Sequence, residues 1–386
     1  MKNNVIFLGC TQNYSYLFSA ANTKVEFLAK GLAEKGDCCT IHNGIIGTSI
    51  IGGDETKNIE KVGTVITYCK KGNQIISWIF NLPKLVKDLK SCRKKVGHAN
   101  FIILESPDYH IFLVYVLLAR LLSFKILIIS HEWGPTVSSI HPLRKPSVYL
   151  FSKTFGYFAD GILPISEFII RKIQHFKKPY IKIPITAEYN QIVIRENPVG
   201  GKYFLYCVYA AYKRVIFQLI DAYVKYSTDT KTCTKLVLVL SGNDEQIGII
   251  KNYIKQIGKE NDICIKTKVP FMMLMDLYAN ALALIIPLDP GNIQDEARFS
   301  QKIAEYLSSG SPIISNNVGE IRYYFKDKEN IILCDYNIDG FVEVFKWVTR
   351  NPDKAKQIGV NGFNLGKKEF DYRELGDRLH KFMRSL

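Results

Sequence analysis

A lysine and a glutamate on one short predicted helix carry the chemistry that this sequence displays most clearly. Lys302 and Glu305 lie three residues apart in the stretch RFSQKIAEYLSSGSPIISNNVGE, residues 298–320. Side chains at this spacing share one face of a helix. A cation near a helix N-terminus suits a diphosphate, and a carboxylate suits ribose hydroxyls, so the pair fits a nucleotide sugar. A surface ion pair on an ordinary helix is the alternative, because such pairs are common and weak.

Polar side chains also follow two apolar segments in the first half of the chain. Glu105 and His110 lie in ESPDYH, and His131 and Glu132 lie in SHEWG. Ligands of doubly wound sheets bind at the carboxyl ends of the strands, so we expect these groups at one sheet edge. For either histidine, a structural hydrogen bond within a loop is the alternative.

Apolar segments of strand length alternate with predicted helices along the chain. This pattern predicts an α/β fold with parallel sheets, whose strand ends would position Lys302 and Glu305 and the polar residues near Glu105 and His131. The pattern begins again after Asn197-Pro198-Val199-Gly200-Gly201, which marks a linker. We therefore expect domains at 1–197 and 198–368, then an amphipathic helix at 369–386 that crosses back to the first domain. The sequence lacks a G-x-G-x-x-G motif, so a nicotinamide or flavin fingerprint is missing. The predicted strands are 4–9, 38–42, 62–68, 101–104, 125–130 and 161–164, then 202–210, 235–242, 263–266, 283–287, 312–315 and 330–334.

The positive charge of the chain is concentrated in its first half. The 386 residues carry a formal net charge of +15, and residues 1–196 hold 25 Lys and Arg against 14 Asp and Glu. A basic surface favours anionic partners. Residues 77–98 combine apolar and basic side chains and predict adsorption to anionic lipid, with a solvated basic helix as the alternative. The side chains concerned are Trp78, Ile79, Phe80, Lys84, Lys87, Lys90, Arg93, Lys94 and Lys95.

Cysteine usage and hydropathy predict a cytoplasmic protein. The nine cysteines are scattered and include no C-x-x-C pair, which argues against a zinc site or a disulfide framework. Met1 leads directly into an apolar strand, without a secretory leader pattern. Residues 111–130 are apolar over about the length of a membrane span. Arg120 and Lys125 favour instead a buried helix to about Leu122, followed by a buried strand.

The stretch around Lys302 resembles the signature of GT-B glycosyltransferases, in particular glycosyltransferase family 4. In that family a helix with K-x-x-E-[YA] precedes a small-Gly-x-P-[VI]-[VI] turn and strand, then a [DN]-x-G-G-x-x-E loop. Lys302 and Glu305-Tyr306 match the first part, 309–314 the second, and 317–320 part of the third. The resemblance implies that Glu305 holds the donor ribose. Many members carry a second glutamate where Ala297 stands, and the adjacent Glu296 is our candidate for its role.

A second segment supports the same resemblance. Residues 204–223, FLYCVYAAYKRVIFQLIDAY, align without a gap to the family pattern FLYVGRLxxxKGxxxLIEAF. Arg214, with Lys213 beside it, takes the place of the lysine that contacts the donor diphosphate, whereas Tyr209 replaces the arginine and Val208 the glycine. Cations here would neutralise charge on the leaving nucleoside diphosphate. The alternative is a basic helix N-terminus without a ligand, which the helix dipole disfavours.

The resemblance implies a GT-B fold, in which two Rossmann-like domains face each other across a cleft. It also implies transfer of a sugar from a UDP- or GDP-linked donor to a glycan or lipid-linked acceptor. The reaction would retain anomeric configuration and serve bacterial surface polysaccharide or glycolipid biosynthesis. No D-x-D motif occurs, so we expect no metal and no other cofactor.

The expected location is the cytoplasm, peripherally at the inner face of the membrane, with no nucleic acid as partner. Two alternatives stay open: a basic nucleic-acid-binding or scaffold protein, and a degenerate GT-B protein that binds nucleotide without transfer. The expected site residues are Lys213, Arg214, Glu296, Arg298, Lys302 and Glu305 for the donor; Glu105, His110 and His131 for catalysis; and Ser19, Ala20 and Glu132 on the acceptor side.

Overall fold

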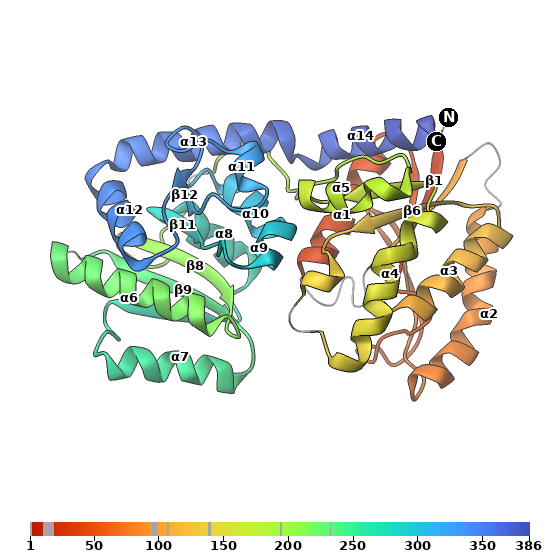
Figure 1. The fold of residues 1–386 in the computed structure, drawn as a ribbon, viewed down its shortest axis with the longest axis horizontal. Coiled ribbons are helices and arrows are strands. Elements are labelled where there is room, and N and C mark those ends of the chain that lie inside the picture. Colours follow the sequence, from red (N-terminus) through yellow and green to blue (C-terminus); the bar gives the residue numbers. More distant parts are fainter. Residues whose placement is uncertain are drawn as a thin grey trace. The chain divides into compact units, whose positions relative to one another are not determined.

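Two separate sheets organise the chain (Figure 1). A computed structural model describes residues 2–10, 19–93, 99–105, 108–137, 140–193, 195–231 and 233–386. The N-terminal unit comprises 1–188, 297–301 and 369–386, and the C-terminal unit comprises 189–296 and 302–368. Each unit is an α/β structure built on its own largely parallel sheet, which confirms the predicted fold class.

The N-terminal unit has a seven-stranded sheet in the order β3-β4-β2-β1-β5-β6-β7. Every pair of neighbours is parallel except β3 with β4. All residues of β1 are buried, as expected for a strand with helices on both faces. The strands are β1 Asn3–Leu8, β2 Cys38–His42, β3 Glu55–Ile59, β4 Gly63–Thr67, β5 Ala99–Leu104, β6 Lys125–Ser130 and β7 Gly161–Pro164.

The helices of this unit cover both faces of its sheet (Figure 1). Right-handed crossovers place α1 on one face and α2, α3 and α4 on the other, since the strand order reverses after β2. The helices are α1 Ala20–Glu34, α2 Gln74–Arg93, α3 Tyr109–Leu121, α4 Lys145–Phe158, α5 Glu167–Ile173 and α14 Tyr372–Ser385, with short 3-10 turns at Gly134–Thr136, Pro142–Arg144 and Gln174–Phe176.

The C-terminal unit has a six-stranded parallel sheet in the order β10-β9-β8-β11-β12-β13. The order reverses between β8 and β11, which is where doubly wound sheets bind ligands. The strands are β8 Tyr203–Tyr209, β9 Lys235–Ser241, β10 Ile263–Thr267, β11 Ala283–Ile286, β12 Ile313–Ser315 and β13 Ile332–Leu333. The helices are α6 Lys213–Thr230, α7 Asp244–Gln256, α8 Phe271–Ala279, α9 Ile293–Ala297, α10 Gln301–Ser309, α11 Ile321–Tyr324, α12 Ile338–Arg350 and α13 Pro352–Glu369.

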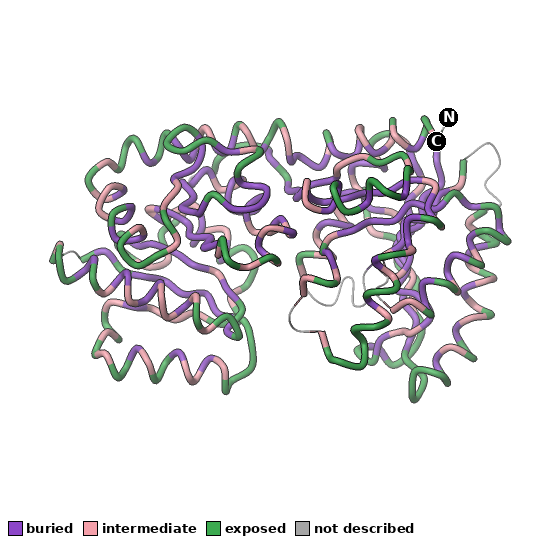
Figure 2. The backbone as a smooth tube through the Cα atoms, viewed as in Figure 1, coloured by how far each residue is buried: buried purple, intermediate pink, exposed green. Residues whose placement is uncertain are grey.

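An aromatic cluster fills the core beneath this second sheet. The ring of Phe204 lies 4.4 Å from Phe345 and 5.8 Å from Tyr226, measured between centroids. All three side chains are buried, and Figure 2 shows the same burial along the strands of both units. The apolar strands therefore hold the sheet edge in a fixed position, as a binding site requires.

The division between the units differs from the predicted boundary at 197/198. The C-terminal unit begins at Tyr189, whose hydroxyl donates to Ala304 O at 2.9 Å and whose ring stands against Gly366. Ile192 packs on Gly310. The Gly- and Pro-rich linker therefore lies inside the C-terminal unit, because apolar residues before it are already packed there.

The last helix packs within the N-terminal unit. Residues 369–386 belong to this unit, and α14 lies against α1. The two helices are in close contact at Gly31 and Gly376: a Cβ atom on Gly31 would stand 2.9 Å from the Cα atom of Gly376. His380 adds a polar contact, with its Nδ1 2.8 Å from the buried carboxylate of Asp37.

Residues 111–130 form α3 and β6, as predicted. In the described part of the chain, no helix is both long and apolar enough to span a membrane. One expectation was wrong: α3 is buried on one side only, and Leu117 and Leu121 on its other side are exposed. Strand β3 was also missed, because ETKNI at the sheet edge is polar and mostly exposed.

Candidate active site

The predicted pair Lys302 and Glu305 lies on α10, at the carboxyl end of β8. The backbone N–H of Cys207 in β8 donates to the Tyr306 hydroxyl at 3.1 Å, which ties the helix to the strand. Glu305 is only 9 % exposed. Burial raises the pKa of Glu305 to about 7, although the Lys302 ammonium opposes the shift. A carboxyl group this buried is not part of an ordinary surface ion pair, which weakens that alternative.

Arg214 and Lys213 begin α6, directly after β8 and its turn. Arg214 is exposed and forms an ion pair with Asp289, which is mostly buried in the loop after β11. Asp289 also accepts a hydrogen bond from Gly291 N at 2.8 Å. Because β8 and β11 are neighbours, the pair spans the point where the strand order reverses.

The loop that carries Asp289 is held by buried polar groups. Asp295 accepts from Asp289 N at 3.1 Å and from the Asn292 side chain at 3.3 Å. Gly319 has φ +57°, and a Cβ atom there would stand 2.6 Å from Asp295 O, so this turn requires glycine. The Asp289 carboxylate is thus fixed in front of Arg214.

Two other predicted donor residues have different surroundings. Glu296 forms an ion pair with Arg322 at 2.6 Å. Arg298 belongs to segment 297–301, which packs in the N-terminal unit rather than in the predicted C-terminal domain. Ser166 Oγ there donates to Ala297 O at 2.6 Å, which anchors the segment. These contacts correct the expected domain assignment of residues 297–301.

In the N-terminal unit, the structure brings Glu105 and His131 together. Glu105 follows β5 and His131 follows β6, its neighbour, and their Oε2 and Nε2 atoms are 3.5 Å apart. Lys24 on α1 is the third ionisable group of this cluster: it is buried, and its Nζ donates to Ile183 O at 2.8 Å. Cys10, after β1, lies beside them.

Burial controls the protonation of this cluster. It raises the pKa of Glu105 to about 8, a shift that Lys24 opposes and Glu132 reinforces. Burial also lowers the pKa of Lys24 to about 7 and that of His131 well below its usual value. Glu105, a carboxyl group that exchanges a proton near neutral pH beside a neutral imidazole, is suited to general acid–base work.

The remaining predicted residues stand apart from this cluster or support helices. His110 lies exposed on α3, with its ring 5.4 Å from that of Trp78. Ser19 is the N-cap of α1 and accepts from Asn22 N at 3.1 Å, and Ala20 is the first residue of that helix. Of the predicted acceptor loop, Ser106 and Pro107 lie outside the described residues, as do 11–18.

The sequence prediction missed two groups at these edges. Lys24 precedes Val25 and stands four residues before Leu28 on the buried face of α1, so a charge in an apolar stripe was the available signal. Cys207 lies in the electrostatic field of both Lys302 and Glu305, and no sequence motif indicated it. Among the described residues, no group of three or more His, Cys, Asp or Glu side chains is placed to hold a metal ion.

Comparisons with known proteins agree with the fold. Residues 190–365 match the family model named Glycosyl transferases group 1. No curated protein matches the chain.

Similar solved structures include sucrose-phosphate synthase from Thermosynechococcus elongatus, with 15% identity, a TM-score of 0.73 and coverage of 100% of this chain and 99% of that one. HepE of Anabaena in complex with UDP is 13% identical, with a TM-score of 0.70 and full coverage of both chains. A glycosyltransferase from Rickettsia africae is 14% identical, with a TM-score of 0.70 and coverage of 99% and 98%.

The two sheets and these similar structures define the class of fold: the chain has the GT-B fold. Within it, residues 190–365, which contain Arg214, Lys302 and Glu305, match the family model of group 1 glycosyl transferases.

Proposed function

We propose that the protein transfers a sugar from a UDP- or GDP-linked donor to a glycan or lipid-linked acceptor. The reaction proceeds with retention of configuration and without a metal, as in glycosyltransferase family 4, and serves surface polysaccharide or glycolipid assembly. The enzyme works in the cytoplasm, at the inner face of the membrane. The observation that carries the proposal is the buried Glu305 beside Lys302 at the carboxyl end of β8.

The chemistry of a nucleoside diphosphate fits the groups at this edge. The Glu305 carboxylate would accept hydrogen bonds from the ribose hydroxyls, which offset its burial. Lys302, Lys213 and Arg214 would face the two phosphates. HepE, which shares the fold, has been solved with UDP and with UDP-glucose, and this supports a uridine donor.

Arg214 must exchange partners in this proposal. Its ion pair with Asp289 is exposed on the arginine side, and Asp289 keeps its hydrogen bond from Gly291 N when the guanidinium leaves. A diphosphate carries more charge than one carboxylate and would compete for the guanidinium. Because Tyr209 replaces the second cation of the family pattern, the exchange makes Arg214 the main diphosphate contact from β8–α6.

The Glu105–His131 pair would serve the acceptor in the N-terminal unit. Glu105 can receive or give a proton near neutral pH, and Lys24 adjusts the pH at which it does so. An acceptor hydroxyl needs such a group because it loses its proton during transfer. His110, which packs on Trp78, is the weaker candidate.

The first test is a thermal-shift screen with UDP, GDP, UDP-glucose and other nucleotide sugars. By mass action, a bound donor stabilises the folded state by about 2.7 kcal/mol at 100 times its Kd, and the unfolding temperature rises accordingly. We expect Glu305→Ala and Lys302→Ala to lose most of the shift. Glu343→Gln, an exposed change on α12, is the matched control and should keep it.

The outcomes separate the alternatives. Nucleotide binding without turnover of any donor would favour a degenerate enzyme. No saturable nucleotide binding, with salt-sensitive binding to random-sequence DNA, would favour a basic nucleic-acid-binding protein instead. Proton NMR of the transferred sugar in the product tests retention of configuration.

A further inference from the structure

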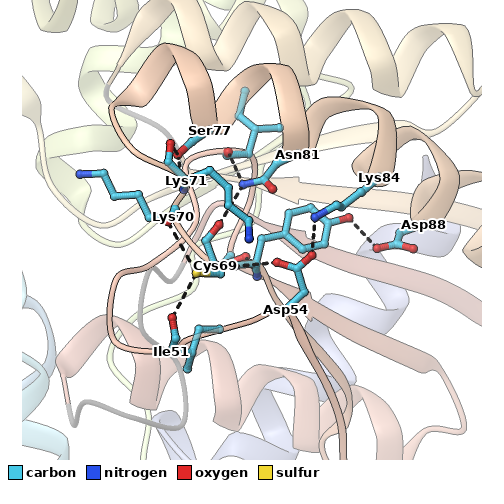
Figure 3. A network of polar contacts seen from close by, with 12 residues as sticks. Ile51, Asp54, Cys69, Lys70, Lys71, Ser77, Asn81, Lys84 and Asp88 are labelled. Carbon is cyan, nitrogen blue, oxygen red and sulfur yellow. Dashed lines mark hydrogen bonds and ion pairs between the residues drawn. The ribbon is translucent and has the colours of Figure 1, made fainter.

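Helix α2 has polar side chains on its inner face. Ser77 and Asn81 are fully buried. The Ser77 hydroxyl donates to Lys71 O at 3.0 Å, and the Asn81 amide donates to Ile45 O at 3.1 Å. Figure 3 shows these contacts beside the ion pair of Lys84 with Asp54. The first half of α2 is therefore held to its unit by hydrogen bonds rather than by an apolar stripe.

The outer face of the same half-helix is apolar. Ile75, Ile79 and Phe80 are 71%, 65% and 56% exposed. Trp78, which the sequence analysis grouped with these side chains, is only partly exposed and packs on His110. Burying Ser and Asn while exposing Ile and Phe is costly for a helix in water, so this arrangement indicates a second environment for the outer face.

Helices α3 and α4 continue the apolar face. The ring of Trp78 joins α2 to α3, and Phe112 joins α3 to α4 through contacts with Phe151 and Phe158. The three helices cover one side of the sheet (Figure 1). Their outward apolar side chains are Leu113, Leu117 and Leu121 of α3 and Tyr149, Leu150 and Tyr157 of α4, all exposed.

The charges of these three helices have almost one sign. Together α2, α3 and α4 contain seven Lys or Arg and one acid, Asp88. The Asp88 carboxylate accepts from the Tyr68 hydroxyl at 2.6 Å. By contrast, α1 on the opposite face has two Lys and two Glu. Lys84 is paired with Asp54 and Arg120 with Asp160, so the excess positive charge of this face rests on the other five cations.

We propose that the outer face of α2, α3 and α4 docks on the surface of an anionic lipid bilayer. Exposed Ile, Leu, Phe and Tyr side chains would enter the headgroup region, and the surrounding ammonium and guanidinium groups would face the lipid phosphates. The surface extends the predicted segment 77–98, of which Lys94, Lys95 and His98 lie outside the described residues. The inference does not depend on the proposed transfer reaction.

The chemistry favours lipid over a protein partner. The apolar side chains are spread over three helices with lysine and arginine among them, as on interfacial helices. A stable interface between proteins instead has an apolar centre from which lysine is depleted. No groove is needed, because a bilayer is itself a broad and deformable surface.

The test is co-sedimentation of the full chain with phosphatidylcholine vesicles that do or do not contain phosphatidylglycerol. We expect binding to the anionic vesicles only, and weaker binding as salt rises. The double changes I79S/F80S and L117S/L121S should each lower partitioning by about tenfold. K87Q/K90Q should lower it by about 25-fold, at about 1 kcal/mol for each charge.

F271S/M272S is the matched control, because it removes exposed apolar side chains from α8 in the C-terminal unit. This control should bind vesicles like the unchanged protein. Equal loss in the control, binding to neutral vesicles, or no binding at low salt would each overturn the proposal. So would a dimer in sedimentation velocity that I79S/F80S converts to a monomer, since the face would then join two copies. UDP-induced stabilisation in each variant separates this outcome from failure of the donor site.

Discussion

Glu305 is buried, and burial raises its pKa to about 7, so the carboxyl group changes charge near physiological pH. The same group is expected to accept the ribose hydroxyls of the donor. Ligand binding and proton binding are therefore coupled at this residue.

The affinity for UDP should rise with pH. Only the ionised Glu305 accepts two hydroxyl hydrogen bonds, and ionisation increases as pH passes through about 7. We expect a gain of roughly tenfold between one unit below and one unit above this midpoint, measured by calorimetric titration. Lys302 lowers the pKa of Glu305, so Lys302→Met should move the Glu305 midpoint upward, as followed by carboxyl NMR without nucleotide because this variant binds UDP poorly. A flat profile in the unchanged protein would contradict this prediction.

Glu105 should make stability fall as pH rises. Its pKa increases from 4.5 to about 8 on folding, so the folded state binds more protons between these values and loses relative stability with rising pH. Glu105→Gln removes this effect. Its unfolding free energy should gain on the order of 1–2 kcal/mol over the unchanged protein between about pH 5 and pH 8, in urea titrations. Glu132→Gln, an exposed neighbour, should give no comparable gain.

Site residues with a recognisable spacing along the chain could be predicted from the sequence. Site residues whose importance depends on contacts with residues distant in sequence could not. Lys302 and Glu305 were found because three residues separate them on a helix. Lys24 was not, because its significance comes from Glu105 and Ile183, which are distant in sequence. The partner of Arg214 was missed for the same reason. Asp289 is 75 residues away in sequence, and its ion pair with Arg214 forms only because β8 and β11 are neighbours in the sheet.

The contact of α1 with α14 depends on two glycines. A Cβ atom on Gly376 would stand 2.4 Å from the backbone of Gly31. Gly376→Ala should therefore lower the unfolding free energy by about 2 kcal/mol, because the helices must separate. Gly248→Ala on α7 is the control: its Cβ atom meets nothing within 4 Å, and it should stabilise by about 0.5–1 kcal/mol. Thermal unfolding that ranks the two variants in the opposite order would refute this account.

At the scale of elements, apolar periodicity predicted nearly all the strands. The buried parallel strands were recognisable because helices on both faces force them to be apolar throughout. Strand β3 lacks that constraint, being an exposed edge strand, and its sequence carried no signal. The orientation of α2 was also unpredictable, because its inner face is polar and the usual assignment of apolar residues to the inside fails there.

At the scale of the whole molecule, the C-terminal unit should require its first residues. A fragment that starts at 198, the predicted boundary, lacks the buried Tyr189 and the contact of Ile192 with Gly310. Removing one large buried aromatic side chain costs about 3–5 kcal/mol. We therefore expect the fragment 189–368 to be more stable in urea than 198–368. Equal stability would restore the predicted boundary.

The fold alone does not fix the donor or the acceptor. GT-B proteins with 10–15% identity to this chain include sucrose-phosphate synthase and OtsA, so the same two sheets serve different enzymes. Function must instead be argued from side chains at the sheet edges. For this chain, the side chain on which the proposed donor assignment depends is Glu305.

The most direct measurement compares UDP with 2′-deoxy-UDP by calorimetric titration, in the unchanged protein and in Glu305→Ala. A hydrogen bond to a charged carboxylate contributes about 1.5–3 kcal/mol, so the unchanged protein should prefer UDP by at least about tenfold. The variant should bind both nucleotides with equal affinity, because the group that recognises the ribose is gone. If UDP does not bind, the comparison is made between GDP and 2′-deoxy-GDP. A preference that survives unchanged in Glu305→Ala, or no binding of either nucleotide pair, would contradict the assignment of Glu305 to the donor ribose.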